Sequence, residues 1–356
     1  MRVEDKKRLT RSSNIELFRI IIMLIIVAHH YVINSGLLTI VETQQNLKFR
    51  DIFLLIFGWG GKTGINCFVL ITGYFMCTSN ITVRKFCKLI GERYFYSIVI
   101  WGVFLVVGYE VFSMKMFLKV IFPFFSVTNN FTGCFLLFYL FIPFLNLLID
   151  AINEKQHLSL IGLCVFVYTI LPSIFKADVS FNYVTWFIVL YFIAAYLRLY
   201  PKRWFSNWKL WGVLSVASLI VSWLSVIVFA YLGIKLEKPG IEYFEVADSN
   251  KLLAVVTAVS LVMFFKNLKI KNSKFINTIA ASTFGVFLIH TNSDAMRKFL
   301  WEDFFKNTSF YNSPYLIVHA IGTVIIVYSV CTLIDWLRIQ LFAKIKKVRE
   351  WSVEEK

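Results

Sequence analysis

Charge is scarce in this sequence of 356 residues, because Asp, Glu, Lys and Arg together make up only 16% of it. Ordinary soluble domains carry roughly a quarter of such residues. Hydrophobic residues reach 58%, aromatic residues reach 18%, and the mean hydropathy is +0.69. A soluble core cannot bury that much apolar surface. The composition therefore excludes an ordinary soluble domain and makes the lipid bilayer the first partner to expect.

Glycine and proline are also sparse, with 16 and 6 residues. The uncharged runs are much longer than the strands of roughly ten residues in outer-membrane barrels, and they can cross a hydrocarbon core of about 30 Å. We therefore predict an all-α fold, a polytopic transmembrane helical bundle of about ten spans. The expected spans are residues 15–36, 54–77, 93–113, 131–150, 157–175, 183–199, 210–234, 250–266, 275–293 and 314–337.

The sequence also lacks the spacings of several site types. There is no C-x-x-C pair, no H-E-x-x-H, no Walker A loop and no glycine-rich dinucleotide fingerprint. We predict no bound metal and no bound cofactor. The six cysteines are interpreted as small buried hydrophobes: Cys67, Cys77, Cys87, Cys134, Cys164 and Cys331.

Basic residues outnumber acidic ones, 37 to 21, but they flank the apolar runs and form no polar face for nucleic acid. With a cytoplasmic N-terminus, 24 of them fall in inside segments and 11 in outside connections. This asymmetry predicts cytoplasmic termini and an even number of crossings. Without a small-residue cleavage pattern, the first run is interpreted as an uncleaved span. We expect one membrane domain, residues 1–345, and a charged cytoplasmic tail, residues 346–356.

The first predicted span carries one arginine and two adjacent histidines. Arg19 and His30 are eleven positions apart, about three turns, so both lie on one stripe and roughly 16 Å apart along the axis. His29 points about 80° away from that stripe, so the two histidines should not be interchangeable. Such residues inside a span are costly unless they face a protein interior or a wet cavity. The stripe is therefore a candidate functional site.

Structural roles remain open for the same residues. Ser13 and Glu16 match a capping box, and Glu16 can pair with Arg19 one turn later. Arg19 can also reach lipid headgroups as an anchor, and His30 can be a hydrogen-bonded structural histidine. The alignment of the two residues favours function.

The pattern Asn14-x-Glu16-x-x-Arg19, followed by ten residues and His30, resembles the first-helix signature of the acyltransferase 3 family. Thr72 stands where that family usually has a serine, and Tyr96 stands where it often has a proline. Other segments resemble the family in the same order: Phe68-Val-Leu-Ile-Thr72-Gly73-Tyr74-Phe75, Arg93-Tyr94-Phe95-Tyr96, Tyr139-Leu-Phe-Ile-Pro143-Phe-Leu-Asn146, Trp186-Phe-Ile-Val-Leu-Tyr191 and Ser282-Thr-Phe-Gly285-Val-Phe-Leu-Ile-His290.

The resemblance implies that acyl-CoA approaches from the cytoplasm and that its acyl group reaches an acceptor hydroxyl within or across the membrane. We predict His30 as the catalytic residue, because an imidazole can take a proton from a hydroxyl or hold the acyl group itself. Arg19 would orient the donor or stabilise negative charge. Arg84, Lys85 and Arg93 would bind the phosphates of CoA, although such a cluster is also the ordinary mark of a cytoplasmic span end.

Weaker candidates lie in other spans. Lys62 and Asn66 are one turn apart and are predicted to bind substrate, unless the span starts near Thr63 and Lys62 sits at its rim. His290 is predicted to meet the acceptor, with Asp294 one turn later, and a polar cap is the alternative. His157 and His319 have no aligned partner and are interpreted as structural.

We therefore predict an O-acyltransferase, most simply an O-acetyltransferase, in the bacterial plasma membrane. Its acceptor would be a hydroxyl of a cell-surface polysaccharide or its lipid-linked precursor. The predicted partners are acyl-CoA, this glycan or lipid-linked glycan acceptor and the lipid bilayer, and no nucleic acid. A transporter or flippase of a lipid-linked sugar is the alternative, but it predicts repeated halves and paired broken helices that this sequence does not display. A non-catalytic sensor or assembly subunit leaves the alignment of Arg19 and His30 unexplained.

Overall fold

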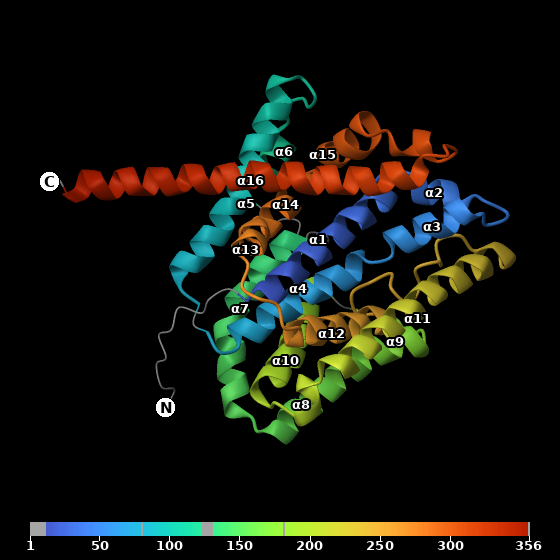
Figure 1. The fold of residues 1–356 in the computed structure, drawn as a ribbon, viewed down its shortest axis with the longest axis horizontal. Helices are drawn as coiled ribbons and strands as arrows, with labels where there is room; N and C mark the ends of the chain where they lie inside the picture. Colours follow the sequence, from blue (N-terminus) through green and yellow to red (C-terminus); the bar gives the residue numbers. More distant parts are fainter. Residues whose placement is uncertain (1–11, 80, 123–130, 181, 355–356) are drawn as a thin grey trace.

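The computed structural model describes residues 12–79, 81–122, 131–180 and 182–354, with side chains as far as residue 345. These residues form helices and connecting loops, without strands (Figure 1). The helices in chain order are α1 (Ser13–Ile33), α2 (Leu37–Glu42), α3 (Phe49–Gly58), α4 (Gly61–Met76), α5 (Val83–Val106), α6 (Met114–Ile121), α7 (Phe131–Ala151), α8 (Glu154–Val165), the π-helix η2 (Phe166–Ile170), α9 (Leu171–Ile174), α10 (Tyr183–Leu199), the 3-10 helix η3 (Arg203–Ser206), α11 (Trp208–Lys235), α12 (Leu252–Asn267), α13 (Lys274–Ala281), α14 (Thr283–His290), α15 (Asp294–Lys298), the π-helix η4 (Phe299–Phe304), the 3-10 helix η5 (Asn307–Phe310) and α16 (Leu316–Glu354).

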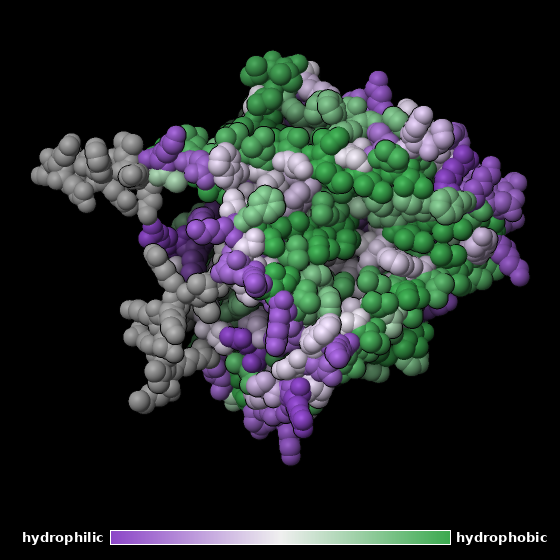
Figure 2. Space-filling view, in the orientation of Figure 1, coloured by the Kyte–Doolittle hydropathy of each residue, from purple (hydrophilic) through white to green (hydrophobic). Residues whose placement is uncertain are grey.

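The all-α transmembrane fold class is confirmed. In the described part of the chain, seven helical segments are long and apolar enough to cross a membrane, and α10 and α12 are shorter apolar helices. Figure 2 shows a broad hydrophobic surface, with hydrophilic residues gathered at the left and bottom and at the right edge. The number of ten crossings stays a prediction. The seven segments are Ser13–Ile33, Phe49–Met76, Val83–Val106, Phe131–Ala151, Glu154–Ile174, Trp208–Lys235 and Leu316–Ile345.

Helix α1 lies at the centre of the bundle, in contact with α3, α4, α12, α13, α14 and α16. Its approach to α4 depends on glycines, as is common between helices in membranes. A Cβ atom at Gly60 or Gly64 would overlap the side chain of Ile25 or Ile26, and one at Gly61 would overlap the ring of His29. The glycines therefore bring α4 directly against the histidine end of α1.

Three predicted spans have different bounds in the structure. The span expected at 54–77 is broken between Gly58 and Gly61, and the span expected at 275–293 is broken at Ser282 and ends at His290. The span expected at 93–113 is α5, which begins ten residues earlier, at Val83. Helix α6 then folds back along α5. Hydropathy did not reveal these breaks because the residues around them are themselves small or apolar.

A buried polar cluster joins α5 to α14 and α16. The hydroxyl of Tyr96 donates to Asp335 Oδ1 at 2.6 Å, and Arg338 lies 2.8 Å from Asp335 and 2.9 Å from Glu92. Asp335 is fully buried. A Cβ atom at Gly285 would overlap its carboxylate, so glycine is required where α14 passes.

The start of α1 and the end of α16 lie toward the same side, on the left of Figure 1. We call the side that holds the start of α1 and the end of α16 the basic face, and we call the other side the opposite face. The charge asymmetry predicts that the basic face is cytoplasmic. The tail expected at residues 346–356 is helical as far as Glu354, and its side chains lie outside the described part.

The cysteine interpretation is confirmed for four of the six residues. Cys164 is half-buried, and the interpretation is wrong for Cys87, which is exposed near the start of α5 because it lies on an outward face of that helix. The four buried cysteines are Cys67, Cys77, Cys134 and Cys331.

Candidate active site

A cavity of about 790 Å³ lies beside the last turns of α1. We call it the histidine cavity, because His29 and His30 both line it. Its other walls come from α4, α5, α6, α7, α10, α14 and α15, so segments far apart in sequence meet there. Its volume lies in the upper part of the usual range for small-molecule sites, about 300–1,000 Å³.

His30 is the first member of a chain of hydrogen bonds. His290 Nδ1 lies 2.6 Å from the carbonyl oxygen of Val286, so this nitrogen must carry a proton. In the neutral ring the other nitrogen, Nε2, is then an acceptor, and it lies 3.0 Å from His30 Nδ1. His30 Nδ1 therefore donates. In the neutral ring of His30, Nε2 is then the acceptor nitrogen, and the described residues give it no hydrogen-bond partner.

His29 has a different partner. Its Nδ1 lies 2.6 Å from the carbonyl oxygen of Gly58, where α3 ends, and donates to it. The break between α3 and α4 leaves this carbonyl free, because no next helical turn takes it up. The ring also lies against Gly61. The break in this span therefore fixes His29 beside His30.

Lys62 follows the same break and lines the histidine cavity. Its ammonium group is hydrogen-bonded to the hydroxyl of Tyr183 and lies 3.6 Å from Asp248 Oδ1. Tyr183 in turn donates to Asp248 at 3.1 Å. Asn66 lies outside the cavity, fully buried, because its amide binds Trp186 and the backbone of Ser249. Of the two predicted substrate ligands in this span, the structure brings only Lys62 to the cavity.

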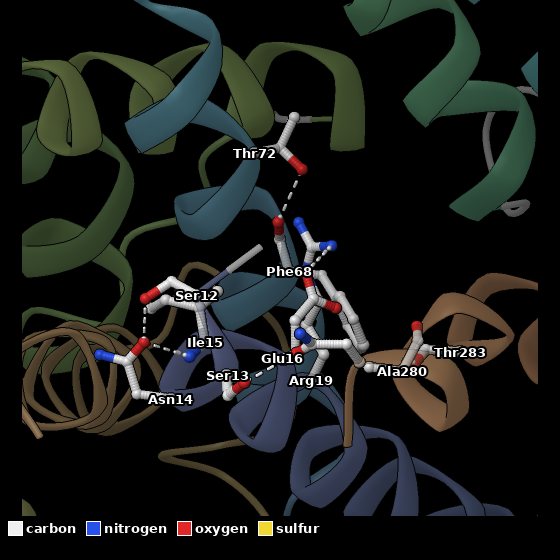
Figure 3. Close-up of polar contacts among 11 residues, drawn as sticks. Ser12, Ser13, Asn14, Ile15, Glu16, Arg19, Phe68, Thr72, Ala280 and Thr283 are labelled. Atoms are coloured by element: carbon white, nitrogen blue, oxygen red, sulfur yellow. Dashed lines mark hydrogen bonds and ion pairs between the residues drawn. The ribbon is translucent and has the colours of Figure 1, made fainter. Parts of the chain in front are cut away.

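A second cavity, of about 290 Å³, lies nearer the basic face, and we call it the basic cavity. Its cationic lining residues are Arg19, Lys85 and Lys88. Figure 3 shows Arg19 between α4, which carries Phe68 and Thr72, and the junction of α13 and α14. The rest of the lining is largely apolar. The cavity thus combines cationic side chains with an apolar surface.

The predicted capping box at the start of α1 is wrong. The N-cap is Ser12, and α1 begins at Ser13. The hydroxyl of Ser13 donates to Asn277 at 2.9 Å, so it holds α13 against α1 and does not cap the helix. Glu16 lies 3.4 Å from the guanidinium of Arg19, which confirms the predicted ion pair (Figure 3).

Four apolar side chains line both cavities: those of Ile26, Ile65, Phe131 and Phe287. Ile26 and Phe287 are buried, and the rings of Phe131 and Phe287 meet edge to face with centroids 5.0 Å apart. Arg19 thus faces one cavity and His30 faces the other, with Ile26 between them on α1. The two cavities therefore adjoin at these four apolar side chains.

The three residues predicted to bind the phosphates of CoA do not lie together in the structure. Lys85 lines the basic cavity, whereas Arg84 lines neither cavity. Arg93 lines the histidine cavity, and its guanidinium donates to the carbonyl oxygen of Val120 at 2.7 Å. Arg93 is therefore displaced from the predicted phosphate site, because it points to the folded-back helix α6.

The remaining histidines are placed as follows. Helix α14 ends at His290, so the expected helical pairing with Asp294 is not formed, and Asp294 instead lies 2.8 Å from Arg297. His157 donates to the backbone of Phe192, at 3.0 Å. His319 is bonded to Tyr31 and stacked on Phe310, so both His157 and His319 have structural partners.

A comparison with family models supplies the deciding observation: the acyltransferase 3 model, described as an acyltransferase domain, matches residues 12–336. The chain belongs to the acyltransferase 3 family. Membership confirms the resemblance seen in the sequence and implies a multi-pass membrane protein with acyltransferase activity. No curated protein matches the chain, and no solved structure matches it.

The sequence of this acyltransferase 3 protein did not reveal the contact between His30 and His290, which are 260 positions apart. One signal was available in the sequence. His30 and His290 lie toward the same end of their predicted spans, so the two residues are expected at a similar depth in the membrane. Tyr183, Lys119 and Arg297 were also missed, and their places in the cavity depend on helix breaks that hydropathy does not show.

Proposed function

We propose that this protein transfers an acyl group, most simply acetyl, from acyl-CoA to a hydroxyl of a cell-surface polysaccharide or its lipid-linked precursor, in the bacterial plasma membrane. Acyl-CoA binds in the basic cavity and the acceptor binds in the histidine cavity. Arg19, Lys85 and Lys88 suit the phosphates of CoA, because charged donors bind phosphate oxygens strongly. The apolar remainder of the basic cavity suits the acyl chain.

The observation that carries the proposal is the position of His30 in the wall of the histidine cavity, with an Nε2 that has no hydrogen-bond partner among the described residues. Its other nitrogen is bonded to His290, which is itself bonded to the last turn of α14. His30 is therefore placed as a general base whose ring is held in one orientation by a hydrogen-bonded neighbour. Carbonyl groups at a helix C-terminus also favour a positive charge, so they support the imidazolium that forms when His30 takes a proton.

In the direct route, His30 Nε2 takes the proton of the acceptor hydroxyl as its oxygen attacks the thioester carbonyl carbon. The bond from that carbon to sulfur breaks, an ester forms, and His30 returns the proton to the CoA thiolate. In the covalent route, the same nitrogen attacks the thioester carbon, and the bond to sulfur breaks to release CoA as its thiolate. The acceptor hydroxyl then attacks this acyl group, the bond from carbon to nitrogen breaks, and the hydroxyl proton passes through the released imidazole to the CoA thiolate. Both routes require the thioester to reach the wall of the histidine cavity that carries His30.

The test uses membranes that contain the wild-type, His30→Gln or His290→Gln protein, with acetyl-CoA labelled in its acetyl group. Transfer of label to envelope glycan should fall to background for His30→Gln. His290→Gln should lower kcat by roughly 100-fold with little change in KM, because it acts through His30. His157→Gln is the matched control, since this buried histidine lies outside both cavities.

Equal labelling by the wild-type and His30→Gln proteins would end the case for His30 as the base. A loss of the same size in His157→Gln would show that the assay reports folding. Protein abundance and thermal stability in detergent are measured for every variant, so that a misfolded variant is recognised.

A further inference from the structure

The histidine cavity carries an excess of positive charge. Its basic lining residues are Lys62, Arg93, Lys119 and Arg297, and its acidic ones are Glu110 and Asp294. Lys62 is compensated by Asp248, at 3.6 Å, outside the lining. Among the described residues, no carboxylate pairs with Arg93 or Lys119.

Arg93 is the most constrained of these cations. It is 9% exposed, and its hydrogen bonds go to backbone carbonyls of Val120 and Lys119, which carry no net charge. A guanidinium keeps its charge in almost any environment. Holding it in a largely buried wall is costly unless an anion offsets the charge. The cavity therefore contains a fixed positive field before any ligand binds.

The acidic lining residues are fewer than the basic ones, and they differ in their surroundings. Burial raises the pKa of Glu110, and the nearby carboxylate of Asp294 raises it further. The side chain of Asp294 is 91% exposed, and its ion pair with Arg297 is open to solvent. Exposed pairs of this kind contribute little and are readily exchanged for another anion. Arg297 is thus available to a ligand.

We propose that the acceptor bound in the histidine cavity is an anionic glycan, whose oxyanion group, a phosphate or a carboxylate, is bound by Arg297 and Lys119 in the field of Arg93. This inference rests on the proposed function, since it names the acceptor class of the same site. The phosphates of CoA do not account for the charge, because the basic cavity has cations of its own. A neutral glycan would leave the buried charge of Arg93 without an anion.

The test measures binding to the purified full-length protein in uncharged detergent, without acyl-CoA. Three probes are compared: trigalacturonate for the carboxylate, inorganic pyrophosphate for the phosphate, and maltotriose as a neutral trisaccharide. We expect one of the anions to bind at least about 10-fold more tightly than maltotriose. Arg297→Gln and Lys119→Gln should each weaken that binding by about 10-fold.

Lys235→Gln is the control, since this exposed lysine at the end of α11 lies outside the cavity. It should bind the anion as the wild type does. The better anion identifies the source of the charge, a uronic acid or a phosphate-linked glycan. Because Lys119 is exposed, its variant keeps the test valid if Arg297→Gln does not fold.

Equal binding of maltotriose and both anions would overturn the proposal, as would anion binding that neither variant weakens. Competition by CoA that requires Arg297 would also overturn it, because the cations would then serve the donor. If anion binding depends on Arg297 but no acyl group is ever transferred, the site stands and the proposed function falls. If transfer occurs to a neutral glycan, the function stands and this inference falls.

Discussion

At the scale of single residues, hydrogen-bond partners decide which nitrogens of the neighbouring residues His29 and His30 can take part in a reaction. His29 is tied to the carbonyl of Gly58 and lies against Gly61, whereas His30 keeps one nitrogen free in the cavity wall. The difference comes from a helix break for His29 and from a distant histidine for His30. Adjacent positions on one helix thus acquire unequal roles through what packs against them.

A carboxyl pair on the opposite face shows the same dependence on surroundings. Glu42 ends α2 and lies beside Glu242, which is buried in the connection between α11 and α12. Burial, followed by the charge of Glu242, raises the pKa of Glu42 from 4.5 to about 7. The folded protein therefore binds a proton here more tightly than the unfolded chain does.

The stability of the protein should fall as the pH rises from about 4.5 to about 7, because Glu42 must then lose its proton in an unfavourable place. Glu42→Gln removes this loss, so its apparent melting temperature in detergent should depend less on pH than that of the wild type. Glu237→Gln is the control, an exposed carboxylate in the same connection. A pH dependence that Glu42→Gln leaves unchanged would contradict the assignment.

Part of the site was predictable from residues alone. The eleven-residue spacing of Arg19 and His30 places both on one stripe of a helix, and each now lines a cavity. Spacing within one span cannot show which other spans pack against it. The partners of His30, Asn66 and Arg93 come from segments far along the chain or from a helix that folds back, so their contacts required the tertiary structure.

At the scale of elements, small residues decide how the helices meet. Gly285 lies where α14 crosses the buried carboxylate of Asp335, which is bonded to Tyr96 and Arg338. These bonds hold α5 to the bundle, and α5 lines both cavities. One glycine therefore supports the shape of the site from a distance.

Gly285→Ala should destabilise the protein by about 1–3 kcal/mol, because the added methyl group overlaps Asp335 in a packed interior. The readout is the apparent melting temperature in detergent. Gly322→Ala, on α16, is the matched control, since nothing lies within 4 Å of a Cβ atom there. It should leave the melting temperature unchanged or raise it slightly. Equal melting temperatures for both alanine variants would mean that α14 and α16 do not pack this closely.

The elements themselves were predicted unevenly. Long apolar runs such as residues 15–36 and 314–337 correspond to α1 and α16, because hydropathy records which residues avoid water. The breaks after Gly58 and Ala281 were not predicted, since they reflect helix packing and produce no run of polar residues. Those breaks position His29, Lys62 and the last turn of α14, so what hydropathy missed is also what shapes the site.

At the scale of the whole molecule, the orientation in the membrane decides which cavity lies nearer the cytoplasm. The basic face is predicted to be cytoplasmic from its excess of lysine and arginine. Cys87 is an exposed thiol near the start of α5, on this face, whereas four of the other cysteines are buried. It is therefore a natural reporter of sidedness.

A membrane-impermeant maleimide should label Cys87 only after cells are permeabilised, and Cys87→Ser should remove the signal. Asn312→Cys in that background places an exposed thiol in the loop before α16, on the opposite face. It should be labelled in intact cells. The reverse pattern would place the basic cavity nearer the outside of the cell, which would contradict the proposed binding of CoA there.

The apolar side chains shared by the two cavities, those of Ile26, Ile65, Phe131 and Phe287, have a bioenergetic consequence. A cell membrane stores energy as an ion gradient. A continuous water-filled path through this protein would let ions cross and would dissipate that gradient. Apolar constrictions exclude water and the ions that travel with it. These four side chains therefore place an apolar surface where the two cavities meet, and this surface opposes the passage of ions from one cavity to the other.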